Sequence, residues 1–120
     1  MSRLLIPDTN FLIYLVKFKM LDELDNYKLI TITQVLDELD KITRARKTKV
    51  DDRVAASIAL DYFKSKNPEL KIQKGKADDA ILALAKKLGA MIGTMDKGLS
   101  TKAKKQGIEI IKIRQKKYLK

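Results

Sequence analysis

The fold of this chain is decided by the stretch Leu4-Leu5-Ile6-Pro7-Asp8-Thr9-Asn10. Its three apolar residues predict a short buried strand that stops at Pro7. Asp8 then stands at the carboxyl end of this strand, and Asn10 can cap the helix that we predict from Phe11. Open α/β sheets bind their ligands at the carboxyl ends of the strands. If Asp8 is functional, other acidic residues should therefore reach the same edge of the sheet.

Strands and helices alternate along the rest of the chain. After the strand at residues 4–6, apolar and β-branched runs predict strands at residues 29–32, 70–72, 90–94 and 108–113. Helices are predicted over residues 11–17, 20–25, 33–42, 54–64, 77–88 and 99–106. This alternation predicts an α/β fold in which helices cover both faces of a five-stranded, mainly parallel sheet. Right-handed crossovers favour the strand order 3-2-1-4-5 within a single domain of residues 1–120.

The 120 residues include neither Cys nor His, and this absence limits the chemistry. Catalysis must use carboxylates, hydroxyls, lysines or a metal held by oxygen, because no thiolate or imidazole is available. A hydrophobic share of 45% suits one packed core. No apolar run reaches the roughly 18–20 residues that cross a bilayer, and no signal peptide is recognisable. We therefore expect a cytoplasmic protein without membrane contact.

Positive charge dominates the chain and is unevenly distributed. The net charge is +11, from 26 basic and 15 acidic residues. Residues 97–120 contain 9 basic residues and 1 acid, and the exposed connection predicted at residues 41–49 contains 5 basic residues and no acid. Residues 114–120 are predicted to form a basic tail. Charge of this size favours a polyanionic partner such as nucleic acid. A lysine-rich surface that serves solubility or heat tolerance is the alternative, and charge alone does not decide between the two.

Helical geometry selects the acids that can face the fold. At about 100° per residue, Glu38 falls at the margin of the buried face of its helix, whereas Asp37 and Asp40 lie farther from it. In the later helix, Asp78 lies close to the apolar stripe and Asp79 lies away from it. Taken alone, Asp78 is better explained as an acid that stabilises a helix start.

Four carboxylates converge on one edge of the predicted sheet: Asp8, Glu38, Asp78 and Asp96. Asp96 follows the fourth strand, where a single Asp would be an ordinary turn residue. Carboxylates grouped in this way repel one another unless a cation joins them. Ligands that are all oxygen suit Mg²⁺ or Mn²⁺. Beside a basic surface, such a cluster is typical of metal-assisted hydrolysis of a phosphodiester.

These segments together resemble the four acidic motifs of PIN domain ribonucleases. The segments are Pro7-Asp8-Thr9-Asn10, Val35-Leu36-Asp37-Glu38-Leu39, Ala77-Asp78-Asp79-Ala80-Ile81 and Gly93-Thr94-Met95-Asp96. The resemblance covers nearly the whole chain. It implies a three-layer α/β/α sandwich and Mg²⁺- or Mn²⁺-dependent endonucleolytic cleavage of single-stranded or structured RNA.

The resemblance also implies a role for each site residue. The metal ligands that it implies are Asp8, Glu38, Asp78 and Asp96. Glu38 would either bind the metal or orient a bound water, and Thr94 matches a hydroxyl residue that positions a carboxylate or water. Asn10 matches a polar residue that supports the first acid, and Asp79 is a further supporting candidate.

The basic segments would contact RNA phosphates, and each contact should steepen the salt dependence of binding. The candidate residues are Lys41, Arg44, Arg46, Lys47, Lys49, Lys97, Lys102, Lys104, Lys105 and Arg114. Tyr118 could stack on a base, although a packing role explains it equally well.

Two branches of the family compete for this chain. One contains the VapC-type toxins of toxin–antitoxin pairs, and the other contains the ribosomal-RNA-processing endonucleases of archaea and eukaryotes. The Ala-Asp-Asp sequence at residues 77–79 and the ending over residues 107–119 resemble the processing branch more closely. Besides RNA, the candidate partners are a second copy of the chain and, in the toxin branch, an antitoxin protein. A non-catalytic RNA-binding or assembly module is the alternative from another class, and the four intact acids argue against it.

Overall fold

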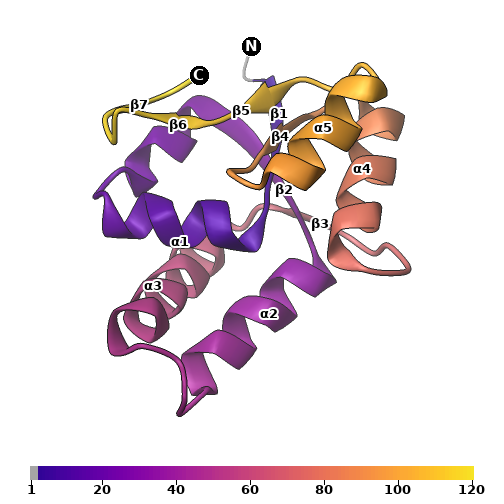
Figure 1. Ribbon diagram of the computed structural model, residues 1–120. Coiled ribbons are helices and arrows are strands. Elements are labelled where there is room, and N and C mark those ends of the chain that lie inside the picture. The colour runs from indigo at the N-terminus through magenta and orange to yellow at the C-terminus, as the bar shows by residue number, and fades with distance from the viewer. Residues whose placement is uncertain (1–2) are drawn as a thin grey trace.

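The computed structural model describes residues 3–120, and a parallel sheet lies at its centre (Figure 1). The strands of this sheet are β1 (Arg3–Pro7), β2 (Tyr27–Ile32), β3 (Glu69–Lys71), β4 (Met91–Gly93) and β5 (Ile110–Ile111). Neighbouring strands are parallel and follow the order β3-β2-β1-β4-β5. The predicted strand order, with the first strand in the centre, is confirmed.

Helices connect the strands and cover both faces of the sheet. They are α1 (Thr9–Lys17), the short 3₁₀ helix η1 (Leu21–Asn26), α2 (Thr33–Arg44), α3 (Val50–Lys66), α4 (Ala77–Leu88) and α5 (Lys97–Lys105). In Figure 1, α1 and α3 lie on one side of the strands, and α4 and α5 lie on the other. Right-handed crossovers produce this division, because the chain moves from β1 to β3 along one face and returns to β4 and β5 along the other.

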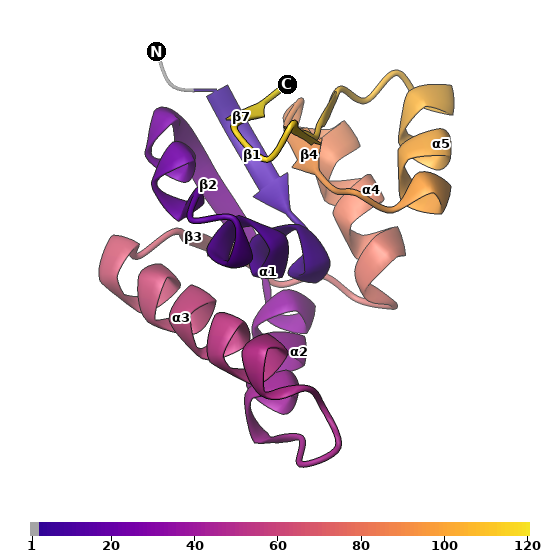
Figure 2. The same cartoon turned by 60° about the vertical axis from the view of Figure 1, so that its left-hand side comes forward.

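The central strand β1 sets the position of Asp8. Leu5 and Ile6 have no exposed surface, as expected for a parallel strand covered on both faces. Directly after the strand, the N–H of Asp8 donates to the carbonyl oxygen of Gly93 at 2.9 Å. Figure 2 shows β1 pointing toward the beginning of α1 and toward α2. The carboxyl ends of β1 and β4 therefore meet where α1 begins.

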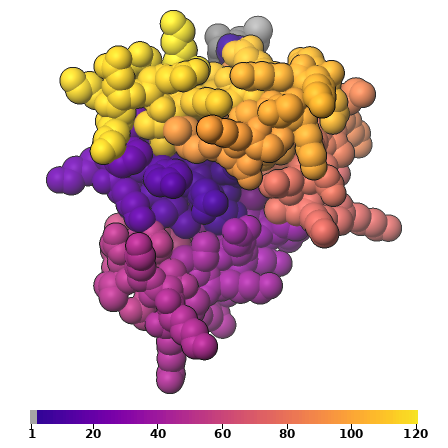
Figure 3. Space-filling view, viewed as in Figure 1, coloured from indigo at the N-terminus to yellow at the C-terminus, as the bar shows by residue number. Residues whose placement is uncertain are grey.

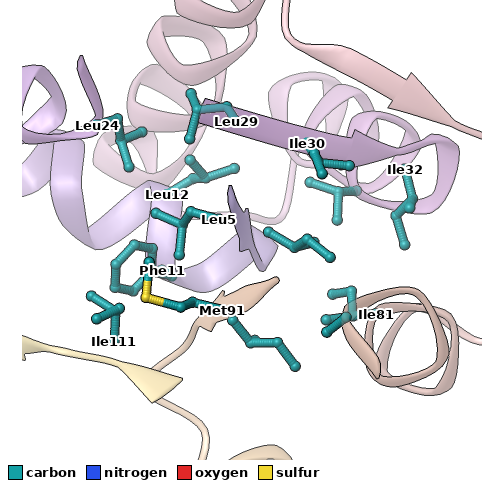
Figure 4. Packing of buried hydrophobic residues seen from close by; sticks show 14 of the residues in the cluster. Leu5, Phe11, Leu12, Leu24, Leu29, Ile30, Ile32, Ile81, Met91 and Ile111 are labelled. Atoms are coloured by element: carbon teal, nitrogen blue, oxygen red, sulfur yellow. The ribbon is translucent and has the colours of Figure 1, made fainter. Parts of the chain in front are cut away.

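A dense core supports these strand ends. Figure 4 shows Phe11 and Leu12 of α1 beside Leu5 of β1 and Met91 of β4. None of these four residues is more than 2% exposed. On the other face of the sheet, Ile81 of α4 is fully buried. Because close-packed interiors deform little, this core holds the strand ends in fixed positions.

At Gly93 the backbone lies close to an aromatic ring of the core. A Cβ atom at this position would lie 2.7 Å from the ring of Phe11, which is itself fully buried. We expect Gly93→Ala to lower the free energy of unfolding by about 1–3 kcal/mol, the usual cost of overpacking, as measured by urea denaturation. Combining it with Phe11→Leu should cost less than the two single changes added together. Strictly additive costs would show that the ring is not the obstacle.

The start of α1 differs from the sequence prediction. The helix begins at Thr9, and its N-terminal cap is Asp8, whose side chain accepts a hydrogen bond from the N–H of Phe11. The prediction that Asn10 caps a helix from Phe11 is therefore wrong. Asp8 already has the extended backbone that a cap requires, with ψ 171°, so the helix starts directly after it.

The basic connection predicted at residues 41–49 is shorter than expected. The helix α2 continues to Arg44, and α3 begins at Val50 rather than at Val54. Asp51 and Asp52 occupy the first turn of α3, where negative charge stabilises a helix. The connection itself spans residues 45–49.

The C-terminal segment forms a hairpin rather than a simple tail. The prediction of one strand over residues 108–113 is wrong, because β5 covers only two of those residues. The hairpin consists of the antiparallel strands β6 (Ile113–Arg114) and β7 (Tyr118–Leu119). Its turn places Gln115 and Lys116 at φ 52° and 54°, as in a type I′ turn. Such turns usually contain Gly or Asn, and neither occurs there to indicate one.

Candidate active site

A small pocket lies at the carboxyl edge of the sheet, where β1 and β4 end. Its volume is about 60 Å³, and its lining comes from the start of α1, from α2, from the first turn of α4 and from the residue before α5. All four predicted acids line it: Asp8, Glu38, Asp78 and Asp96. The surfaces of α1, α2, α4 and α5 meet on the face of the molecule in Figure 3. The structure therefore places carboxylates from four separate segments around one pocket.

Asp8 is the buried member of this group, at 9% exposure. Its Oδ1 accepts a hydrogen bond from the N–H of Phe11 at 2.8 Å, and its Oδ2 accepts one from the hydroxyl of Thr94. The pKa of Asp8 is raised from 3.8 to about 6, mainly by burial. The two hydrogen bonds act against this rise, and the charges of Asp78 and Asp96 contribute to it. Ionisation of Asp8 therefore lowers the stability of the folded protein.

Thr94 connects two of the acids. It is fully buried, and its hydroxyl donates to Asp8 while it accepts from the N–H of Asp96 at 3.0 Å. Thr94 follows β4, and its own N–H donates to the carbonyl of Ile111 at 3.2 Å. The hydroxyl that the sequence singled out thus lies between the end of β1 and the start of α5.

Glu38 reaches the pocket from α2, although the residue as a whole is exposed. Its Oε2 accepts a hydrogen bond from the hydroxyl of Thr9 at 3.2 Å. Thr9 is buried and lines the same pocket, and sequence reasoning assigned it no role. Its position directly after Asp8 was the available signal.

Asp78 and Asp79 occupy the same first turn of α4 but differ in position. Asp78 lines the pocket, whereas Asp79 does not. Partial burial raises the pKa of Asp78, and the charge of Asp96 raises it further, while Lys102 lowers it. Asp79 acts on this pKa in the same direction as Asp96. The supporting role of Asp79 stays a prediction, and in this structure Asp79 acts on Asp78 through its charge.

Asp96 caps α5 and so has a structural role as well. Its Oδ1 accepts hydrogen bonds from the N–H groups of Gly98 at 2.7 Å and Leu99 at 3.3 Å. Asn10 also lines the pocket and is exposed to solvent. Its predicted support of Asp8 has no counterpart among the hydrogen bonds of residues 3–120, where Phe11 and Thr94 bind that carboxylate.

Gln34 is a further residue that sequence reasoning missed. Its Nε2 donates to the carbonyl oxygens of Gln73 at 2.8 Å and Gly75 at 2.9 Å. These two carbonyls belong to the loop that runs from β3 into α4, and Asp78 follows it. The first turn of α2 thereby holds the segment that delivers Asp78.

The chemistry of this pocket fits a hard divalent cation. Four carboxylates are available, and the whole chain has no His or Cys, so the donors are the oxygens that Mg²⁺ and Mn²⁺ prefer. The acids do not converge on one point, however: among residues 3–120, no three His, Cys, Asp or Glu side chains form a group that could hold a metal ion. Protein donors form hydrogen bonds with Asp8, Glu38 and Asp96 in this arrangement.

The predicted RNA contacts are all exposed side chains. They lie at the end of α2, in the loop at residues 45–49, along α5 and on β6. Arg44 forms an ion pair with Asp40 at 3.4 Å, which reduces the charge it can offer. Lys102 of α5 is close enough to lower the pKa of Asp78. Positive charge therefore reaches the rim of the acid pocket.

Hydropathy along the helices also bears on the predictions about membranes. None of the helices within residues 3–120 combines the length and the apolar character that a bilayer span requires.

Comparison with known proteins identifies the family of this chain. Residues 3–116 match the family described as PIN-like domain. The chain is 32% identical to ribonuclease VapC4 of Methanocaldococcus jannaschii, over 95% of this chain and 92% of that protein. It also resembles a solved domain of a functionally unknown protein from the same organism, with a TM-score of 0.64 and 18% identity over 94% of this chain and 92% of that one. These matches do not support the predicted preference for the ribosomal-RNA-processing branch over VapC. They do show that the chain belongs to the PIN-like domain family.

Proposed function

We propose that this chain is a metal-dependent endoribonuclease of the VapC type. One observation carries the proposal: separate elements of a PIN-like fold bring four acids to one pocket at the carboxyl edge of the sheet. The name of the relative, ribonuclease VapC4, supports RNA as the substrate. The exposed lysines and arginines of α2, α5 and the loop between α2 and α3 supply the phosphate contacts that RNA needs. A purely RNA-binding module would have no use for the acid pocket.

The carboxylates of the pocket would hold the cation. Asp8, Asp78 and Asp96 are the proposed ligands of Mg²⁺ or Mn²⁺, and Glu38 is either a further ligand or an acceptor for water. The bound ion would lower the pKa of a water molecule and neutralise negative charge on the phosphate. The protein would supply orientation, because the hydroxyl of Thr94 fixes the carboxylate of Asp8 relative to the backbone of Asp96.

Cleavage of defined RNA by the purified chain tests this proposal. Ribosomal RNA, tRNA and single-stranded oligonucleotides are incubated with Mg²⁺, with Mn²⁺ or with a chelator, and the ends of the products are sequenced. We expect cleavage at defined positions that stops when the ion is chelated. Cleavage that survives chelation would overturn the metal requirement. Tight binding of all these RNAs without cleavage would identify a non-catalytic module instead.

Asp78 and Asp79 provide a matched pair for the site. Each change to Asn removes one negative charge from the same helical turn, but only Asp78 lines the pocket. We expect Asp78→Asn to lower the cleavage rate on the order of 10²-fold or more. Asp79→Asn should keep the rate within about threefold, because it changes only a long-range charge. Equal losses in single-turnover cleavage would contradict the assignment of Asp78.

A further inference from the structure

We infer that a groove beside the acid pocket binds one nucleotide of single-stranded RNA next to the cleaved phosphate. Tyr14 would stack on its base, and Lys49 would contact its phosphate. The inference rests on the proposed ribonuclease function and adds the place where the substrate lies.

The groove is a cavity of about 350 Å³ between α1, the end of α2 and the loop that leads into α3. This volume is at the small end of the roughly 300–1,000 Å³ that ligand pockets occupy. Ile13 and Ile42 supply apolar wall, whereas Asn10, Thr48 and Lys49 supply polar groups. A flat apolar base and a charged phosphate need such a mixed lining.

Asn10 joins this groove to the acid pocket, because it lines both cavities. It is exposed at the second residue of α1, and its amide can both donate and accept hydrogen bonds. A chain that leaves the acid pocket past Asn10 therefore enters the groove directly. A larger cavity of about 780 Å³ lies near the beginning of β2, beside Tyr27 and Lys28, and shares no lining residue with the acid pocket.

Tyr14 offers an aromatic surface in a fixed orientation. It lines the groove and is 41% exposed. Its ring stacks on Phe18, with centroids 5.8 Å apart and planes inclined by 13°. The ammonium of Lys116 lies 5.3 Å from the centre of the Phe18 ring. Because Phe18 already packs against Tyr14, little freedom of the tyrosine ring is lost when a base stacks on it.

Positive charge on the groove favours a polyanion. Lys49 is exposed and forms no ion pair within residues 3–120. Lys17, in contrast, is bound by Asp52. The adjoining Arg46 and Lys47 are also exposed. An aromatic ring beside unpaired cations is the combination that binds single-stranded nucleic acid without base pairing.

Binding of a short oligouridylate tests the groove. Anisotropy is measured in an Asp8→Asn background, so that cleavage does not consume the RNA. We expect Tyr14→Ala to weaken binding about tenfold, and Tyr14→Phe to retain it. Tyr62→Ala is the control, because Tyr62 lines the larger cavity beside β2 and not the groove. It should weaken binding less than about twofold.

A second pair of variants removes charge without removing packing. Lys49→Ala should weaken binding more than Lys28→Ala, which deletes the same charge beside the larger cavity. Thermal unfolding of every variant shows whether the fold is intact. Photocrosslinking of thiouridine RNA to the Asp8→Asn chain leaves Tyr14 in place, and we expect the crosslinks in residues 10–17 and 42–52. Crosslinks confined to other segments, or equal losses from Tyr14→Ala and Tyr62→Ala, would overturn the inference.

Parallel cleavage assays separate this inference from the proposed function. If the unsubstituted chain cleaves RNA and Tyr14→Ala cleaves it at the same rate and positions, the inference that the groove binds the substrate is wrong. The proposed ribonuclease function is then retained. If binding depends on Tyr14 but the unsubstituted chain cleaves no RNA, the proposed ribonuclease function is wrong. The groove is then still a site that binds RNA.

Discussion

Replacement of Asp8 by Asn is expected to lower the rate of RNA cleavage on the order of 10²- to 10³-fold, the range found when a charge-stabilising group is removed from an active site. The amide has nearly the same shape and can keep both hydrogen bonds, by accepting from Phe11 and donating to Thr94. The loss would therefore come from the missing negative charge. RNA affinity should change little, because it depends on the basic surfaces.

Single-turnover cleavage and filter binding on the same RNA measure the two expectations. Asp61→Asn is a suitable control, because Asp61 is an exposed acid of α3 that lies outside the pocket. Equal cleavage by the wild type and Asp8→Asn, in preparations free of contaminating nuclease, would remove Asp8 from the mechanism. A folded Asp8→Asn chain that no longer binds RNA would contradict the separation of binding from catalysis.

The same substitution is expected to stabilise the fold at neutral pH. Folding raises the pKa of Asp8 from 3.8 to about 6, so ionisation of this carboxyl costs the folded state up to about 3 kcal/mol. The cost is absent below pH 3.8, grows as the pH rises and is complete above about pH 6. This cost does not arise with Asn, which cannot ionise. The free energy of unfolding of Asp8→Asn should therefore exceed that of the wild type by up to about 3 kcal/mol at pH 7 and by nearly nothing near pH 4.

Urea denaturation of both proteins across this pH range tests the expectation, without divalent ions in the buffer. The difference between their free energies of unfolding should fall as the solution is acidified from pH 7. A less stable Asp8→Asn protein at pH 7 would show that its hydrogen bonds depend on the ionised carboxylate. The expected outcome is a variant that loses activity and gains stability, the opposite responses that strained sites often show.

The sheet was predictable because local pattern and topology act together. Apolar runs separated by helical patterns define the strands, and crossover handedness leaves few orders for them. The hairpin of β6 and β7 was not predictable in this way. Gln115 and Lys116 have positive φ but are not residues that favour such turns, so the local sequence does not indicate this one.

The placement of the acids was partly predictable from helical angles. Asp78 lines the pocket and Asp79 does not, which agrees with their angles from the apolar stripe, while their catalytic roles stay predictions. The hydrogen bonds around the acids were not predictable. The contacts of Thr9 with Glu38 and of Gln34 with Gly75 join residues far apart in sequence, so no local pattern indicates them.

The position of β4 beside β1 has a consequence for synthesis of the protein. Asp8 and Glu38 emerge early from the ribosome, whereas Asp96 and the hydroxyl of Thr94 that fixes Asp8 emerge near the end. Until β4 adds to the sheet, the growing chain has three of its four acids but lacks Asp96 and the hydroxyl that binds Asp8. If the proposed activity needs all four acids, we expect the chain to become competent to cleave RNA only when almost all of it has been made.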